Sequence, residues 1–190
     1  PTQNLVDAFQ TANGYKITLS ADGWKTDDPD FDITRPYEGR DPRFATTILA
    51  NGMTFKGSVI ETYEGGADYS RTRSDLNSIT GYYLRKYIQE STSFIPEARV
   101  QNKHHWIVYR YAEAVLTYAE AANEYFSDPT ISDSELAMTA ADALNMVRRN
   151  AGMPDVTADD YAGFKAAVQN EWRVDLHSRT TGSGMCAAGR

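Results

Sequence analysis

The clearest pattern in the chain is a repeat of small and apolar residues every three or four positions between residues 106 and 176. It falls into three stripes: Val108, Ala112, Val115, Ala119, Ala122 and Phe126; then Ala137, Ala140, Leu144, Val147 and Ala151; then Tyr161, Phe164, Val168 and Trp172. This spacing places each stripe on one face of a helix. Because the connectors are short, we expect an antiparallel helix pair with a third helix packed on it.

Local signals set the expected bounds of these helices. The first helix is expected over residues 106–126. For the second, Ser132 with Glu135 three residues later forms a capping-box pattern, and Gly152 with Pro154 indicates its end. The third helix is expected to begin after Thr157.

Residues 1 to about 103 show no such long repeat and predict short elements joined by loops. The expected elements are a helix over 3–13 followed by Gly14, a loop over 21–36, a helix from Pro42 to Asn51 capped by Asp41 and ended by Gly52, and extended segments over 59–63 and 82–88 around a glycine-rich loop. The expected fold class is therefore mainly α, with a helix pair beside a loop-rich region that holds a few short strands.

Composition narrows the class of protein. A chain of 190 residues with 41% apolar residues is long enough for one domain with a hydrophobic core. A formal charge of -7 disfavours nucleic acid as a partner and suits a neutral ligand. No apolar run reaches the length of about 18 residues that a membrane span requires. Cys186 is the one cysteine, so an internal disulfide is excluded.

Motifs for catalysis, metals and cofactors are missing from the sequence. There is no nucleophile elbow, zinc motif or phosphate loop, so we predict no enzyme, no catalytic residue and no cofactor. His104 and His105 are adjacent, which is the wrong spacing for a zinc pair on a helix. Glu113 and Glu120 share a helix face and could act as an acid–base pair, but we expect a structural role.

Two polar clusters leave alternatives open. The aspartates between residues 27 and 32 resemble the first ligands of a calcium loop, but Ile33 stands where that loop needs glycine, so a solvated acidic loop is the preferred interpretation. Arg40, Asp41 and Arg43 could bind a phosphate or carboxylate. We favour a structural network in which Asp41 caps the helix and both arginines pair internally.

Five sequence blocks, in order along the chain, resemble one family. They are PTQ-LVDAF at residues 1–9, GRDPRF at 39–44 with TI and NG following, TGYYLRKY at 80–87, RYAEAVLTYAEA at 110–121 and ALNMVRRNAG at 143–152. Together they resemble the C-terminal part of the SusD/RagB outer-membrane nutrient-binding lipoproteins, over residues 1–176, with a loop-rich part (1–103) and a helical part (104–176).

The resemblance implies a fold, a partner and a location. It implies tetratricopeptide-like helix pairs, of which this chain holds one, with others upstream. It implies capture of oligosaccharides, or in some members peptides, for a SusC-like TonB-dependent barrel transporter. It also implies a place on the outer membrane of Bacteroidota-type bacteria, held only by a lipid on a cysteine far upstream of Pro1.

The last residues depart from the family pattern. After Leu176 the family has a segment similar to AFEDHRFWDVRRW, whereas this chain reads HSRTTGSGMCAAG. Deleting one nucleotide from a coding string for LAFEDHRFWDVRRW yields LHSRTTGSGMCAAG, which is residues 176–189. We therefore hypothesise that residues 177–190 are a frameshifted read. Resequencing the source DNA tests this, because intact in-frame codons with a stop after Arg190 contradict it.

Aromatic side chains in loops are the candidate ligand platforms, because a ring face packs against the C–H face of a sugar. Trp24 and Tyr37 flank the acidic loop, and Tyr63 and Tyr69 border the glycine-rich loop. Each of these rings could equally belong to the core, and Trp106 is assigned to the core. The alternative function is a helical-repeat adaptor that binds a protein partner through its concave face.

Overall fold

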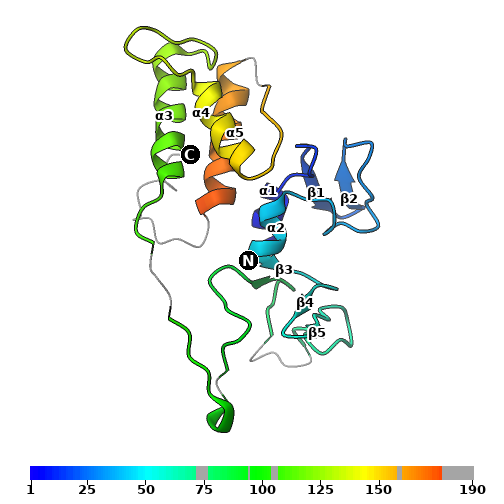
Figure 1. Cartoon of the computed structure of the whole chain (residues 1–190). Coiled ribbons are helices and arrows are strands. Elements are labelled where there is room, and N and C mark those ends of the chain that lie inside the picture. Colours follow the sequence, from blue (N-terminus) through cyan, green and yellow to red (C-terminus); the bar gives the residue numbers. More distant parts are fainter. Residues whose placement is uncertain (72–76, 94, 104–106, 158–159, 177–190) are drawn as a thin grey trace.

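The computed structural model describes residues 1–71, 77–93, 95–103, 107–157 and 160–176. It confirms a mainly helical fold with a few short strands. Helices α3 (Tyr111–Phe126), α4 (Ala140–Asn150) and α5 (Tyr161–Leu176) pack side by side, and the loop-rich region lies against one end of them (Figure 1). The predictions for His104, His105 and Trp106, and for residues 177–190, lie outside the described residues.

The core of the helical part is built largely from the predicted stripes, with Leu116 and Ala143 as members that the stripes did not include. Its buried members are Val115, Leu116, Ala119, Ala122, Ala140, Ala143, Leu144, Val147, Phe164 and Val168. Alanine at the contact positions of α3 and α4 lets the two helices approach closely, and larger side chains from α5 fill the remaining space. The helix pair with a third helix packed on it is therefore confirmed.

Two predicted helix starts are wrong. α3 begins at Tyr111, five residues later than expected, and Val108 is exposed outside the helix. The capping box assigned to Ser132 and Glu135 does not start α4. Instead Asp133 Oδ1 accepts hydrogen bonds from the backbone N–H groups of Glu135 and Leu136, which closes a tight turn. The residues before Ala140 have no continuous apolar face to bury, so a helix there would gain little from packing.

A pair of substitutions separates the observed cap of α4 from the expected one. Thr139 Oγ1 accepts a hydrogen bond of 3.0 Å from the backbone N–H of Asp142. Thr139→Ala removes this cap and is expected to lower the free energy of unfolding by about 1 kcal/mol. Ser132→Ala is the control and is expected to change it by less than about 0.5 kcal/mol. Urea unfolding measures both, and equal losses would contradict the assignment of the cap.

The loop-rich region is made of short elements. They are α1 (Gln3–Ala8), the antiparallel hairpin β1 (Ile17–Ser20) and β2 (Gly23–Thr26), α2 (Pro42–Thr47), β3 (Ile48–Leu49) paired with β6 (Tyr83–Leu84), the small hairpin β4 (Thr54–Phe55) and β5 (Ser58–Val59), and the 3-10 turn η1 (Pro96–Ala98). The expected helix over 3–13 thus stops at Ala8. The expected loop over 21–36 contains β2. The predicted extended segments yield little strand, only Val59 in 59–63 and Tyr83–Leu84 in 82–88.

Helix α2 has the predicted start but a different end. Asp41 Oδ1 accepts from the backbone N–H of Arg43 at 2.9 Å, and Pro42 takes the first turn, as expected. The helix ends at Thr47 rather than at Asn51. Ile48 and Leu49 are buried and pair with Leu84 and Tyr83, and this pairing replaces the last expected turn of helix.

A second core joins the two parts. It contains Val6, Ala8, Phe9, Phe44, Ile48, Ala50, Tyr82 and, from α5, Val174. Asn170 of α5 also donates to the Ala8 backbone oxygen at 2.9 Å. The loop-rich part is therefore seated on α5. No helix in the described part of the chain is both long and apolar enough to cross a bilayer.

Candidate functional site

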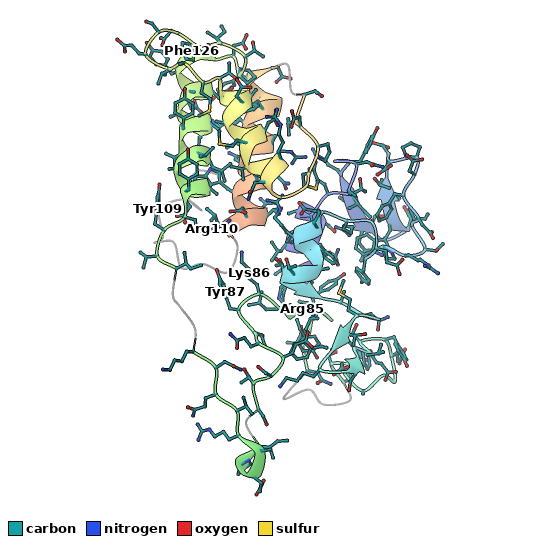
Figure 2. All side chains as sticks on the ribbon, viewed as in Figure 1. Arg85, Lys86, Tyr87, Tyr109, Arg110 and Phe126 are labelled. Atoms are coloured by element: carbon teal, nitrogen blue, oxygen red, sulfur yellow. The ribbon has the colours of Figure 1, made fainter. Side chains whose placement is uncertain are left out.

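A cleft of about 1080 Å³ lies where the loop-rich part meets the helices. One wall is formed by the end of α2 and residues 85–88, and the other by the start of α3 and the end of α4. Figure 2 shows Arg85, Lys86 and Tyr87 below Tyr109 and Arg110, with the extended segment between them running away from the body. We call this feature the helical cleft.

The floor of the helical cleft is a set of ion pairs around Asp175. Arg110 Nη1 lies 2.9 Å from Asp175 Oδ2, and Arg43 Nη1 lies 3.7 Å from Asp175 Oδ1. Lys86 Nζ donates to the Asp175 backbone oxygen at 3.0 Å. Asp175 is buried and lines the cleft with both arginines, so these cations have a counter-charge within the protein.

Arg43 is held by carboxylates on two sides. It bonds Asp41 at 2.7 Å and also pairs with Glu171. Burial by itself lowers the pKa of Arg43, but the hydrogen bonds and negative charges of Asp41 and Glu171 outweigh burial and hold that pKa above its usual range. The preferred structural role of Arg43 and Asp41 is therefore confirmed.

Exposed tyrosines surround the cleft. Tyr87 and Tyr111 line it and are 39% and 75% exposed, and Tyr109 beside Arg110 is 63% exposed. Tyr87 has a left-handed backbone with φ of 69°, a conformation that is uncommon for a residue with a side chain. Ring faces for apolar contact and guanidinium N–H groups for hydroxyl oxygens therefore lie on one surface.

Two of the predicted platforms, Trp24 and Tyr37, pack against the second core. Trp24 lies in β2 rather than in a loop, and its ring meets the Tyr37 ring edge-on at 5.8 Å. Tyr37 stacks on Phe44 at 6.1 Å, and its hydroxyl lies 3.2 Å from the Tyr82 hydroxyl. The guanidinium of Arg40 lies 5.6 Å from the Trp24 ring centre. Both rings are half-buried, so each offers only part of its surface to a ligand.

The other two, Tyr63 and Tyr69, lie on the glycine-rich loop as expected. Tyr63 is exposed, and its hydroxyl donates to Glu61 at 3.3 Å. Tyr69 is half-buried, and Asn77 Nδ2 donates to its backbone oxygen at 2.8 Å. Ligand binding by Trp24, Tyr37, Tyr63 and Tyr69 stays a prediction.

Other polar candidates have structural surroundings. Arg40 is buried and donates to the backbone oxygens of Val6, Phe9 and Pro36, so it closes the end of α1. Glu113 is buried and accepts from the Arg110 backbone N–H at 2.9 Å, as a helix cap does. Those two structural roles match the expectation.

In the acidic loop, Asp28 is buried and accepts from Asn13 Nδ2 and from the Asp30 backbone N–H. Burial alone raises the pKa of Asp28, but hydrogen bonds from Thr11 and Asn13 outweigh it and lower that pKa. Within the described residues, no three His, Cys, Asp or Glu side chains gather to hold a metal ion.

Sequence reasoning missed the residues of the helical cleft. Lys86 and Tyr87 stood in the TGYYLRKY block and Arg110 opened the α3 block, but each block was interpreted as an element and not as a surface. The signal in the sequence is an aromatic ring, Tyr87, next to the cation Lys86, within the predicted extended segment over 82–88. Such a pair favours a binding surface. The approach of residues 85–88 to residue 110 depends on tertiary packing.

An antiparallel helix pair with a third helix and a loop-rich layer seated on it defines a mainly helical, SusD-like class of fold. The chain belongs to the SusD family, which it matches over residues 1–178. It is 31% identical to a SusD-like protein from Bacteroides fragilis, with a TM-score of 0.68, over 94% of this chain and 33% of that one.

A second solved structure, a SusD-like carbohydrate-binding protein from the same bacterium, is 28% identical with a TM-score of 0.63, over 93% of this chain and 33% of that one. The chain thus spans about a third of the length of these structures. No curated protein matches it.

Proposed function

We propose that this chain is part of a glycan-capturing component of an outer-membrane uptake system, and that the helical cleft is its ligand seat. The observation that carries the proposal is the set of exposed tyrosines around internally paired cations, in a chain of the SusD family. The protein is proposed as a binding component and not as an enzyme. The similarity to a structure described as a carbohydrate-binding protein supports the ligand class.

The charges of the cleft suit a ligand that carries no charge. Arg85 pairs with Glu90 at 2.6 Å, and Arg110 pairs with the buried Asp175. Because the guanidinium charges already have counter-charges, an anion is not required to balance them. Their remaining N–H groups can donate to sugar hydroxyls, while the rings of Tyr87 and Tyr111 cover apolar C–H faces.

The proposed partner is a SusC-like TonB-dependent barrel that receives the glycan. The proposed location is the cell surface, where a lipid anchor holds the protein to the outer membrane. The family assignment supports both proposals. Co-purification with a barrel transporter from membrane extracts tests the partnership, and a protein that stays in the aqueous fraction without such a transporter contradicts it.

Loss of the cleft rings is expected to weaken glycan binding. Tyr87→Ala with Tyr111→Ala removes two exposed ring faces, and we expect the affinity to fall about tenfold or more. Titration calorimetry on the protein at its natural length, with oligosaccharides first selected on a glycan array, measures this effect. Tyr125→Ala is the control, because Tyr125 is 73% exposed near the far end of α3.

The same assay separates the alternatives. Trp24→Ala and Tyr37→Ala test the rings of the second core, and Tyr63→Ala and Tyr69→Ala test the glycine-rich loop. Unchanged affinity in the Tyr87→Ala, Tyr111→Ala variant would contradict the helical cleft as the binding site and place that site elsewhere on the protein. A protein that binds no glycan, but binds peptides or a partner protein, would favour the peptide ligand or the adaptor function.

A further inference from the structure

A second hollow, of about 1180 Å³, lies between α1, the start of β1 and α5, and the α4–α5 connector closes one end of it. We call it the amide groove. Its residues belong to parts of the chain that the helical cleft does not use, except for the shared helices α4 and α5.

Neutral polar side chains are prominent in the lining of the amide groove. Five carboxamides line it, together with four hydroxyl-bearing residues and only five charged side chains. The carboxamides are Asn4, Gln10, Asn13, Gln169 and Asn170. The charged side chains are Lys16, Arg148 and Arg173 against Asp7 and Asp155, so the charges nearly balance. Gln10, Asn13 and Asn170 donate to the Gly14 oxygen, Asp28 and the Ala8 oxygen, whereas Asn4 and Gln169 are exposed. An exposed carboxamide both donates and accepts, as a sugar hydroxyl does, which suits an uncharged polyhydroxylated ligand.

An exposed ring accompanies these amides. Tyr15 lines the groove and is 42% exposed. Its backbone is fixed from both sides, because the Thr11 backbone N–H donates to the Tyr15 oxygen at 2.9 Å and the Tyr15 N–H donates to Thr11 Oγ1 at 3.2 Å. A ring on a fixed backbone is a pre-organised platform for the apolar face of a sugar.

The walls of the groove are held together by a buried cation. Arg148 is 4% exposed and donates to the Pro154 oxygen at 2.8 Å and to Gln10 Oε1 at 3.0 Å. Gln10 in turn donates to the Gly14 oxygen at 2.7 Å. Gly14 has φ of 85°, and a Cβ there would lie 2.9 Å from the Pro154 ring, so only glycine lets the connector approach this closely. The groove therefore exists before any ligand arrives.

We infer that the amide groove is a second binding site for a neutral oligosaccharide, separate from the helical cleft. This inference rests on the proposed function for its ligand class. Asn4 and Gln169 supply hydrogen bonds from the two walls, and Tyr15 supplies the ring face.

Paired variants of the protein at its natural length test the inference. Tyr15→Ala is expected to lower affinity for a neutral oligosaccharide at the groove about tenfold. The double variant Asn4→Ala, Gln169→Ala is expected to lower it about fivefold. Both sets of positions are at the surface, and circular dichroism checks that the fold is retained. Tyr125→Ala is again the matched control and should leave binding unchanged.

Calorimetric stoichiometry separates the two sites. Two equivalents of a short oligosaccharide are expected for the unmodified protein, and one for Tyr15→Ala. Full binding by both groove variants, with loss only in Tyr87→Ala, Tyr111→Ala, would overturn this inference and leave the proposed function in place. No glycan binding by the unmodified protein would overturn both.

Discussion

Replacing Glu171 by Gln is expected to lower the free energy of unfolding by about 3–5 kcal/mol. Glu171 is 1% exposed and lies between two arginines, pairing with Arg43 and, at 3.2 Å, with Arg148. The substitution keeps the size and shape of the side chain and removes its charge. Arg148 would then stay buried with only neutral partners, and an uncompensated buried charge is costly.

Urea unfolding followed by circular dichroism measures the effect as a lower midpoint with an unchanged slope. Glu124→Gln is the control, because Glu124 forms an exposed pair with Lys165 on the surface of the same bundle. Ion pairs on the surface contribute little to the free energy of unfolding. If both variants unfolded at the same urea concentration, Glu171 could not be the electrostatic link between α2, α4 and α5.

The second large effect is expected for Arg40→Met, which should lower the free energy of unfolding by about 3 kcal/mol or more. Arg40 Nη2 donates to the Val6 and Phe9 oxygens at 2.6 Å each, and Nη1 donates to the Pro36 oxygen at 3.0 Å. Burial lowers the pKa of Arg40 to about 10, although Asp7 and other neighbours oppose this shift. Methionine fills a similar volume but removes the three guanidinium hydrogen bonds to these carbonyl oxygens.

Thermal unfolding with Arg40→Lys alongside tests the geometry as well as the charge. Lysine restores a cation but lacks the planar fork that reaches several carbonyls at once, so we expect only partial rescue. Arg35→Met is the control, since the Arg35–Glu38 pair is exposed. Full recovery with lysine would show that charge, and not the fork, holds the end of α1.

The helical part was largely readable from the sequence, because its signals are local. Each helix has a stripe of residues at helical spacing, and one member of each stripe is Val115, Leu144 or Phe164. All three are buried in one core. Gly152 has φ of 76° and follows the end of α4, as a left-handed terminator should. In both cases the deciding interaction lies within a few residues along the chain, so pattern and propensity suffice.

Wrong predictions arose where a distant partner competes with a local preference. Residues 48 and 49 leave helix α2 because β6, about 35 residues later, offers them a strand partner. Ser132 is a good cap in isolation, but between it and Ala140 only Met138 packs against the core, and it is only partly buried. Helix propensity is a weak prior and yields to tertiary burial.

The amino-acid sequence by itself determined the family, the three helices and the Asp41–Pro42 helix start. Only the tertiary structure decided which charged groups meet. Arg43 and Glu171 are 128 residues apart in the chain, and no local pattern records that they pair. The two hollows likewise form where segments from both parts of the chain converge. Surfaces of that kind depend on how formed helices and strands pack together. The spacing of residues in the sequence determines which face of an element a side chain lies on, but not which other element packs against that face.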